Sequence, residues 1–269
     1  MPSAPRIFGI LNITSDSFSD GGRFLRPDAA VAHARALVAA GAKVIDVGAA
    51  SSHPDAAEVS AAEEIARLEA VLPRLRETGA EISIDSFQTE TQRWALAQGV
   101  DWLNDVNGFS DASLYDALAA APCRLVVMHA IQSKGVATRA DPPEGGIMAH
   151  IDRFFTARLE ALQGAGVSRD RLVIDPGMGF FLGRHPDPSL DALARLSHLK
   201  QAFGLPVLVS VSRKSFLRTL SGRTLEDAAP MTLAAELWAA RTAADFIRTH
   251  DVAQLADALA LYEALEGRG

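Results

Sequence analysis

Short apolar runs alternate with longer helix-like segments along the whole chain. The runs are rich in Val, Ile and Leu, as strands buried on both faces should be. The expected strands are Ile7–Leu11, Val44–Val47, Ile82–Asp85, Trp102–Asn104, Leu125–Met128, Leu172–Ile174, Val207–Val211 and Phe246–Ile247. The expected helices are Asp28–Ala40, Ser60–Thr78, Thr89–Gln98, Ile147–Gln163, Ser189–Phe203 and Thr232–Ala244, and glycines follow most of them. This alternation predicts an α/β protein, a (β/α)8 TIM barrel formed as one domain by residues 1–269.

Each of these eight runs ends at a polar residue that is capable of chemistry. The ends are Asn12, Asp46, Asp85, Asn104, His129, Asp175, Ser212-Arg213-Lys214 and Arg248-Thr249-His250. In a barrel the carboxyl ends of all eight strands meet on one face, which is where barrel enzymes build their sites. Three long segments, Thr14–Pro27, Ala49–Val59 and Ala130–Gly146, follow the first, second and fifth strands and are expected to act as lids or substrate clamps. The pattern therefore predicts an enzyme.

Composition narrows the class of partner. The chain has 269 residues, 48% of them hydrophobic, and 26 basic against 33 acidic side chains give a net charge of −7. An acidic protein is a poor candidate for nucleic-acid binding, although a local basic cluster still permits an anionic small substrate. Cys123 is the only cysteine, which excludes an internal disulfide. Because no apolar run approaches about 18 residues, we expect a cytoplasmic protein without a membrane span.

Basic residues gather at the last two strand ends. Ser212-Arg213-Lys214-Ser215 follows an apolar strand at the expected start of a helix, where an anion or an electron-rich ring would be favoured. The alternative is a solvated basic turn. Arg248 and His250 occupy alternating positions at the last strand, and late strands of barrels commonly bind phosphate. For His250 alone, a cap of the final helix is the alternative.

Acidic and amide side chains end three other strands. Asp85 and Asp175 can each accept two N–H bonds from a heterocycle that carries an amino group, and Asn104 offers both a donor and an acceptor. The alternative for either carboxylate is a cap of the next helix. Asp46 is equally compatible with a site residue and with a hydrogen-bonding residue of the barrel wall.

The segment after the first strand is dense in oxygen atoms. Asn12 and the run 13–22 can order around a substrate, or around Mg²⁺ held jointly with phosphate oxygens. A featureless polar loop is the alternative. No pair of histidines has the spacing of zinc ligands, so no zinc site is assigned.

Taken together, these motifs resemble those of dihydropteroate synthase. The matching segments, in the family's order, are Gly9-Ile10-Leu11-Asn12, Asp16-Ser17-Phe18-Ser19-Asp20-Gly21-Gly22, Asp175-Pro176-Gly177, Gly179-Phe180, Ser212-Arg213-Lys214-Ser215, Arg248 and His250. The family joins 4-aminobenzoate to a hydroxymethyl-dihydropterin pyrophosphate and releases pyrophosphate with the help of Mg²⁺. The resemblance also implies a homodimer.

The resemblance assigns roles residue by residue. Asp85, Asp175 and Lys214 would be catalytic, and the pterin would be bound by Asp85, Asn104, Met128, Asp175 and Lys214. Pyrophosphate would be bound by Asn12, Arg248 and His250, with Asn12 also holding the metal. Aminobenzoate would be bound by Ser52, His53, Phe180, Phe181 and Ser215.

Two loops depart from the family pattern. After the second strand the family has Gly-Gly-Glu-Ser-Thr-Arg-Pro where this chain reads Ala49-Ala50-Ser51-Ser52-His53-Pro54, so His53 replaces an arginine. An imidazole is a weaker anion clamp than a guanidinium. After the sixth strand an extra ring stands in Gly179-Phe180-Phe181-Leu182, where it would narrow the aminobenzoate pocket. Both loops, with Val127-Met128-His129, resemble the sulfonamide-resistant, plasmid-borne subgroup, and reduced sulfonamide sensitivity is therefore a hypothesis.

Two other functions remain open. A pterin-binding methyltransferase would share the pterin-holding acids but does not need a pyrophosphate site, against which the cationic strand ends argue. A non-catalytic paralogue that binds a pterin or a protein without turnover draws its support from the altered His53 loop alone.

Overall fold

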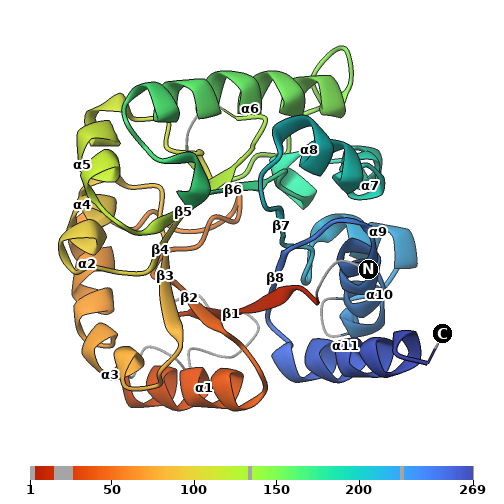
Figure 1. The fold of residues 1–269 in the computed structure, drawn as a ribbon, viewed down its shortest axis with the longest axis horizontal. Coiled ribbons are helices and arrows are strands. Elements are labelled where there is room, and N and C mark those ends of the chain that lie inside the picture. The colour runs from red at the N-terminus through yellow and green to blue at the C-terminus, as the bar shows by residue number, and fades with distance from the viewer. Residues whose placement is uncertain (1–3, 15–26, 133–134, 225–226, 269) are drawn as a thin grey trace.

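Eight parallel strands run through the molecule and helices surround them (Figure 1). The computed structural model describes residues 4–14, 27–132, 135–224 and 227–268. The strands are β1 (Arg6–Asn12), β2 (Val44–Gly48), β3 (Glu81–Asp85), β4 (Trp102–Asp105), β5 (Arg124–Met128), β6 (Leu172–Asp175), β7 (Leu208–Val209) and β8 (Phe246–Thr249). They pair in the order β6-β5-β4-β3-β2-β1-β8-β7, and a parallel bridge between Ile174 and Val207 joins the two ends. The predicted (β/α)8 barrel is confirmed.

Helices connect successive strands and pack outside the barrel. They are α1 (Pro27–Ala39), α2 (Ala61–Glu69), α3 (Leu72–Arg76), α4 (Thr89–Ala97), α5 (Tyr115–Ala120), α6 (Ile147–Gly164), α7 (Pro186–Ala194), α8 (Leu196–Phe203), α9 (Ser215–Ser221), α10 (Ala229–Thr242) and α11 (Val252–Glu266). Short 3₁₀ turns occupy Ala112–Leu114, Arg169–Arg171 and Gly179–Phe181. Within the described ranges, no helix has the length and apolar character needed to cross a membrane.

Several expected boundaries were wrong. The segment expected as one helix to Thr78 divides into α2 and α3, because Pro73 in the first turn of α3 has no N–H to continue a hydrogen-bond ladder. The helix expected from Ser189 begins earlier, at α7, and breaks at Arg195, whose φ of −113° and ψ of 25° are not helical. Gly164 lies within α6, and the left-handed residue that follows this helix is Gly166, with φ 95°. The seventh strand contributes only Leu208–Val209 to the ladder.

An aromatic plug fills the interior of the barrel. One inward-facing cluster consists of Phe8, Val44, Trp102, Val126, Val173, Leu208 and Phe246. The rings of Phe8, Trp102 and Phe246 meet edge to face with centroids 5.0–5.5 Å apart, and the guanidinium of Arg124 lies 4.3 Å from the Trp102 ring. Such contacts add to the hydrophobic stabilisation of the plug. These side chains therefore fill the barrel interior beneath the carboxyl ends of the strands.

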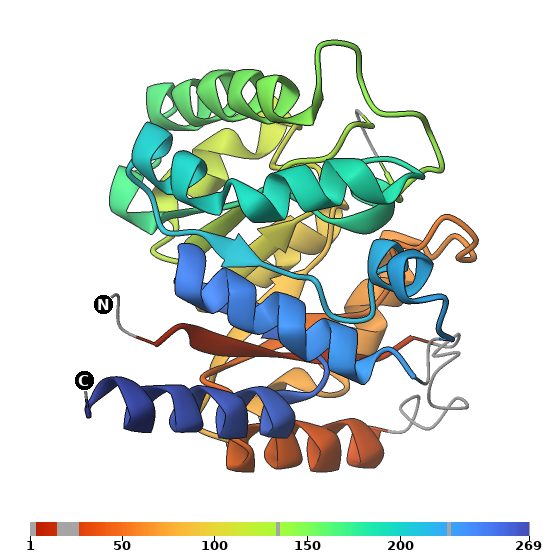
Figure 2. The ribbon, with the colours of Figure 1, turned by 90° about the vertical axis from the view of Figure 1, so that its right-hand side faces the viewer.

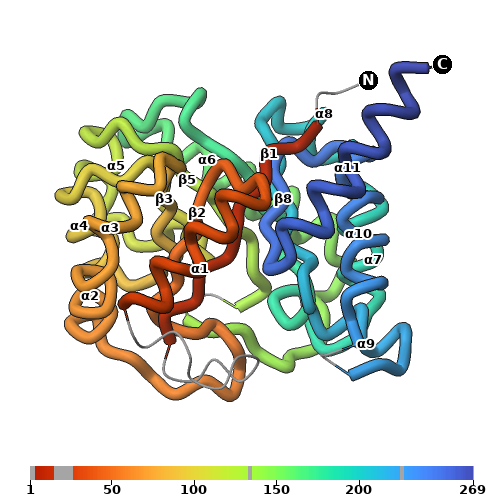
Figure 3. The backbone as a smooth tube through the Cα atoms, turned by 90° about the horizontal axis from the view of Figure 1, so that it is seen from below, coloured from red at the N-terminus to blue at the C-terminus, as the bar shows by residue number. Residues whose placement is uncertain are grey.

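The long connections lie on one side of the barrel. Figure 2 shows the β2–α2 and β5–α6 connections projecting on the same side, beyond the carboxyl ends of the strands. The start of β1 and the end of α11 lie at the opposite end (Figure 3). The expected long loops after the second and fifth strands are thus confirmed, whereas residues 15–26 of the first loop, with Asp16–Gly22, lie outside the described residues.

Candidate functional site

Polar side chains line the barrel directly above the aromatic plug. Alternate residues of a strand face the same side, so the residue two positions beyond each plug residue also faces inward. This rule applied to six strands gives Asp46, Asn104, Met128, Asp175, Ser210 and Arg248. A pocket of about 320 Å³, a volume that includes the open space at its mouth, is lined by Ser52, Asp85, Asn104, Val106, Met128, Asp175, Gly177, Met178, Phe181, Ser210, Lys214 and Arg248. The alternation of inward-facing residues along the strands therefore places the polar pocket residues directly above the aromatic plug.

Arg248 spans the pocket and joins two carboxylates. Its Nε donates to Asp46 Oδ2 at 2.5 Å, and its Nη2 donates to Asp85 Oδ2 at 2.6 Å. The Asp46 side chain is fully buried, and the Arg248 and Asp85 side chains are 14% and 17% exposed. Burial opposes the charge of Arg248, but Asp46 and Asp85 outweigh it and raise the pKa of the guanidinium. Burial raises the pKa of Asp85, which Arg248 opposes and Asp46 reinforces.

Asp175 and Lys214 form the second charged part of the pocket. The Gly177 N–H donates to Asp175 Oδ1 at 2.8 Å. Burial raises the pKa of Asp175 to about 6, although the Gly177 N–H and Lys214 oppose the shift. Burial lowers the pKa of Lys214 to about 8; Arg248 adds to this, while Asp175 and Asp85 oppose it. The Lys214 ammonium lies 5.1 Å from the Phe181 ring centroid, so the pocket carries both signs of charge on adjacent walls.

A left-handed backbone conformation at Arg213 precedes Lys214 and turns the chain toward the pocket. Arg213 has a left-handed φ of 59°, which is strained for a residue with a side chain. The Thr232 hydroxyl accepts from the Arg213 N–H at 3.2 Å and holds this conformation. Of the two predicted cations, Lys214 lines the pocket and Arg213 does not.

Unsatisfied acceptors in this region call for a ligand with donors. Asn104 Oδ1 and Asp46 Oδ1 are buried and have no hydrogen-bond partner among the described residues. A buried acceptor without a partner costs free energy, of the order of 1–3 kcal/mol. Asn104 lines the pocket with Asp85 and Asp175, so these three side chains can accept several N–H bonds from one flat ring, and Lys214 can donate one. The pocket suits an electron-rich heterocycle with amino and carbonyl groups.

The pocket lining leaves out five predicted residues: Asn12, Ser215, His250, His53 and Phe180. Asn12 ends β1 beside Gly48, with which it is in register. Ser215 begins α9. His250 is held by Ser212, whose hydroxyl lies 2.9 Å from His250 Nδ1. Burial, with Arg213 and Arg248, lowers the pKa of His250 well below its usual range, so the imidazole is neutral in this state.

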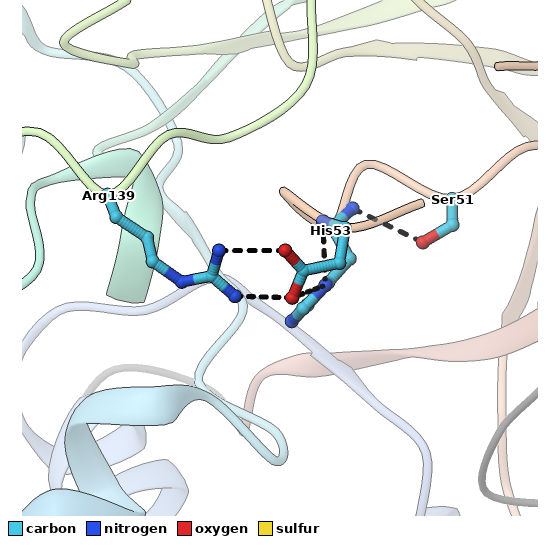
Figure 4. A network of polar contacts seen from close by, with 4 residues as sticks. Ser51, His53 and Arg139 are labelled. Atoms are coloured by element: carbon cyan, nitrogen blue, oxygen red, sulfur yellow. Dashed lines mark hydrogen bonds and ion pairs between the residues drawn. The ribbon is translucent and has the colours of Figure 1, made fainter. Parts of the chain in front are cut away.

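A polar network ties the two long loops together at the pocket rim (Figure 4). Arg139 donates through Nη1 to Asp55 Oδ1 at 2.7 Å and through Nη2 to Oδ2. The Ala137 N–H donates to the Ser52 carbonyl at 3.0 Å. His53 Nδ1 accepts from the Asp55 N–H at 3.2 Å. The β2–α2 and β5–α6 loops are therefore joined by both backbone and side-chain bonds.

Phe180 stands within this network, whereas Phe181 enters the pocket. The Phe180 ring meets the His53 ring edge to face at 5.8 Å, and the Arg139 guanidinium lies 5.4 Å from its centroid. Phe181 is 4% exposed and lines the pocket. Burial lowers the pKa of His53 against the effect of Asp55, and Arg139 lowers it further. His53 is thus a rim residue that supports Phe180.

Comparison with known proteins agrees with this geometry. The pterin binding enzyme family matches residues 8–250. "Dihydropteroate synthase type-2" of Escherichia coli is 58% identical over 260 residues, covering 97% of this chain and 96% of its own. "Dihydropteroate synthase type-1" of Escherichia coli is 51% identical over 261 residues, covering 96% and 93%. The chain belongs to the dihydropteroate synthase family. The structure of Xanthomonas albilineans dihydropteroate synthase with 4-aminobenzoic acid superposes with a TM-score of 0.89 at 36% identity, covering 98% and 94% of the two chains.

Membership of the dihydropteroate synthases confirms the family resemblance of the motifs, and the structure shows what they missed. Asp46 is the inner partner of Arg248, and Val106, Gly177, Met178 and Ser210 also line the pocket. Ser210 was discoverable, because it lies two residues beyond Leu208 in the same inward register. Arg139 was not, since the β5–α6 loop has no periodic pattern. Within the described residues, no group of three His, Cys, Asp or Glu side chains is placed to hold a metal.

Proposed function

We propose that this dihydropteroate synthase condenses 6-hydroxymethyl-7,8-dihydropterin pyrophosphate with 4-aminobenzoate and releases pyrophosphate. The observation that carries the proposal is that three acceptors and one cation line a single pocket: Asp85, Asn104, Asp175 and Lys214. The two carboxylates and the amide accept the N–H groups of the pterin, while Lys214 donates to it and Met128 packs against it. The similarity to the Xanthomonas albilineans dihydropteroate synthase, whose structure is with 4-aminobenzoic acid, supports 4-aminobenzoate as the second substrate.

The reaction breaks one C–O bond and forms one C–N bond. The bond between the exocyclic methylene and pyrophosphate breaks, and its electron pair leaves with the pyrophosphate oxygen. Asp85 and Asp175 favour electron donation from the pterin ring toward the methylene carbon. The aniline nitrogen of aminobenzoate then bonds to that carbon and gives up one proton. The protein contributes positioning and electrostatic stabilisation, without a covalent intermediate.

Pyrophosphate binding is assigned to Asn12, Arg248 and His250, at the ends of β1 and β8, which are paired in the sheet. Arg248 already holds two carboxylates, so it stays charged and fixed while the leaving group departs. A hard cation fits this end of the pocket, because an amide oxygen from Asn12 and phosphate oxygens are the ligands that Mg²⁺ prefers. Bound Mg²⁺ would offset the negative charge of the leaving group.

Aminobenzoate binding is assigned to the rim at Ser52, His53, Phe180, Phe181 and Ser215. Ser52 and Phe181 line the pocket, and Phe180 is supported by His53. The Phe181 ring reduces the space beside Lys214. At the rim, His53 stands where the family pattern has an arginine. A pocket narrowed by Phe181 discriminates between 4-aminobenzoate and the larger sulfonamides, which supports reduced drug sensitivity.

One assay tests the function and its alternatives. Purified protein with Mg²⁺, the pterin pyrophosphate and 4-aminobenzoate is expected to release pyrophosphate only when both substrates are present. Ligand binding without product would instead favour a non-catalytic paralogue, and no pyrophosphate release but methyl transfer from a methyl-folate would favour the methyltransferase. In the same assay a sulfonamide at a concentration equal to that of aminobenzoate should inhibit weakly. Strong inhibition far below that concentration would contradict the resistance hypothesis and leave the synthase intact.

Arg139 offers a prediction at the rim. Arg139→Gln removes the ion pair to Asp55 and the cation over Phe180. Because the pair is exposed, the effect should be modest: we expect the KM for 4-aminobenzoate to rise about two- to fivefold, with the KM for the pterin unchanged. Arg184→Gln is the matched control, since Arg184 makes an exposed ion pair to Asp141 in the same region but does not contact Phe180. Equal effects of the two variants on KM would show that Arg139 has no specific role.

The assembly and location of the protein stay predictions. A homodimer is expected from the family resemblance, and light scattering on the purified protein measures it. A cytoplasmic location is expected because no apolar run is long enough for a membrane anchor, and fractionation of expressing cells tests it.

A further inference from the structure

His129 lies directly behind the pocket, on the opposite side of the barrel wall. It follows Met128, which lines the pocket, so the period of the strand turns its side chain outward toward α6. The ring is fully buried and packs against Phe154 and Phe155 with centroids 5.2 and 6.4 Å apart. The described contacts of its ring are with the protein interior, so His129 does not touch the pocket.

Both ring nitrogens of His129 have fixed partners. Nδ1 lies 3.0 Å from the Pro176 carbonyl oxygen, and Nε2 lies 2.8 Å from His150 Nδ1. A carbonyl only accepts, so His129 Nδ1 carries the hydrogen. Burial lowers the pKa of His129 to about 3, so the ring is neutral and its Nε2 accepts from the Nδ1–H of His150. The hydrogens therefore run in one direction, from His150 through His129 to Pro176.

The end of this chain is the turn that holds Asp175. Gly177 has a φ of 74°, and a Cβ built on it would lie 2.3 Å from the His129 carbonyl oxygen, so this turn lies directly against the backbone of His129. The His129 N–H donates to the Asp175 carbonyl at 2.8 Å, and the Gly177 N–H donates to the Asp175 carboxylate at 2.8 Å. The His129 N–H and imidazole therefore bind two successive carbonyl groups, those of Asp175 and Pro176.

We propose that the His150–His129 chain is a positioning device that fixes the Pro176–Gly177 peptide and thereby aims the Asp175 carboxylate at the pterin. The proposal rests on the function proposed above. His129 and His150 are positioning residues, since neither contacts the pocket. An ordinary core histidine would affect stability alone, whereas a positioning histidine affects pterin binding through one particular hydrogen bond.

Two variants of His129 separate these roles. In His129→Asn the amide nitrogen lies near the former Nδ1 and can still donate to Pro176. In His129→Gln the amide reaches the former Nε2 position, keeps the contact with His150 and leaves the Pro176 carbonyl without its donor. We expect His129→Gln to raise the KM for the pterin at least about tenfold, because one buried hydrogen bond is lost. His129→Asn should raise this KM less than about threefold. The KM for 4-aminobenzoate should change in neither.

The pH profile supplies a second readout. Loss of a fixed Gly177 N–H removes a group that lowers the pKa of Asp175, so the acid limb of kcat/KM should move to higher pH in His129→Gln and stay in place in His129→Asn. The other charged groups that act on Asp175 are Lys214, Arg248 and Asp46. Arg153, on α6, acts on His150. None of them is altered by either substitution. Equal KM values and equal acid limbs in the two variants would overturn the proposal.

Nuclear magnetic resonance tests the chain without turnover. With ¹⁵N-labelled histidine, His129 should be the Nδ1–H tautomer between pH 5 and 8, with a through-hydrogen-bond coupling from its Nε2 to His150 Nδ1. A Nε2–H tautomer would overturn the proposal even in an active enzyme. If the protein is inactive, the tautomer still reports on the chain, so failure of the function and failure of this inference are distinguishable.

Two further variants complete the design. His150→Leu changes a half-buried helix position and removes the donor to His129 Nε2, which should raise the pterin KM about two- to fivefold. His198→Asn is the matched histidine control, because it removes an exposed contact of the His198 ring with the Asp152 carboxylate, between α8 and α6. It should leave both KM values unchanged. A pterin KM for His150→Leu equal to that of the control would overturn the role of His150.

Discussion

Replacing Arg248 with methionine is expected to lower kcat/KM at least about 100-fold and to destabilise the fold by about 3–5 kcal/mol at pH 8. The substitution leaves Asp46, fully buried, and Asp85 without the cation that both contact. Removing one partner of a buried ion pair leaves an uncompensated charge, which costs more than the pair itself contributes. Urea unfolding and pyrophosphate release measure the two effects.

The pH dependence distinguishes this cause from simple loss of packing. Burial raises the pKa of Asp85, and loss of Arg248 raises it further, so the cost of its charge is full above the folded pKa and disappears as pH falls toward about 4. The difference in unfolding free energy between wild type and variant should therefore shrink from pH 8 to pH 5.5. Arg171→Met is the matched control, because Arg171 donates to the backbone carbonyls of Cys123 and Leu118 and makes no ion pair with a carboxylate within the described ranges. A destabilisation by Arg248→Met that does not change with pH would contradict the orphaned-charge explanation.

A charge-conserving variant isolates the geometry. Arg248→Lys keeps a cation but cannot reach two carboxylates with the planar fork of a guanidinium. It should be more stable than Arg248→Met at pH 8 while its activity remains low. Activity close to wild type would show that charge alone suffices.

The site residues were predictable from sequence where strand geometry decides. Parallel strands of a barrel end at one face, and alternate residues of a strand share a side, so the sequence alone places the polar ends at Asp85, Asn104 and Asp175 in one pocket. Lys214 was predictable for the same reason, since it follows an apolar run. All four line the pocket.

The pairing inside the pocket was not predictable. Arg248 and Asp46 are 202 positions apart in the chain, and no local pattern links them. Assigning Arg248 to anion binding alone overlooked that the inward register of β2, β3 and β8 brings its guanidinium to two acids. The ambiguity of Asp46 between wall and site also had a structural cause, because it does both: it is buried in the wall and holds a site residue.

The predicted helix boundaries were wrong where a residue type can occur both inside a helix and at its end. Gly164 is a plausible terminator by composition, but the helix continues through it and the left-handed residue is Gly166. Pro73 was the available signal for the break between α2 and α3, because a proline inside a helical pattern removes a donor. The ion pair between Asp55 and Arg139 at the rim could not be predicted, because contacts between loops follow neither the helical nor the strand periodicity.

Activity is expected to follow a bell-shaped curve against pH, with an acid limb between about 6 and 7, set by Asp175 and Asp85, and an alkaline limb near 8. Asp175 must be ionised to accept the N–H groups of the pterin, and burial raises the pKa of Asp175 to about 6. Lys214 must be protonated to donate, and burial lowers the pKa of Lys214 to about 8. Beyond each limb, kcat/KM for the pterin should fall about tenfold per pH unit. Because Asp85 and Asp175 lie in one pocket, the acid limb belongs to the set rather than to one residue.

Two substitutions assign the limbs. Lys214→Arg should move the alkaline limb above the measurable range, because arginine stays protonated, while lowering the maximum. Asp175→Asn should lower kcat/KM by about 100-fold or more and leave an acid limb that reports the ionisation of Asp85 alone. An alkaline limb that stays near pH 8 in Lys214→Arg would contradict the assignment to Lys214.

Stability should run against activity over the same pH range. The folded protein holds the Asp175 proton more tightly than the unfolded chain does, so this group adds stability as pH falls from about 6 toward 4. Lys214 holds its proton less tightly when folded, so it adds stability as pH rises from about 8 toward 10.5. Between these ranges both groups are charged and buried, which is the state that catalysis needs and the one that costs the fold most. Unfolding free energies of wild type and of Asp175→Asn should therefore diverge as pH rises from 5 to 7, with the variant more stable. A variant that is less stable than wild type at pH 7 would show that Asp175 is held by its partners strongly enough to outweigh its burial.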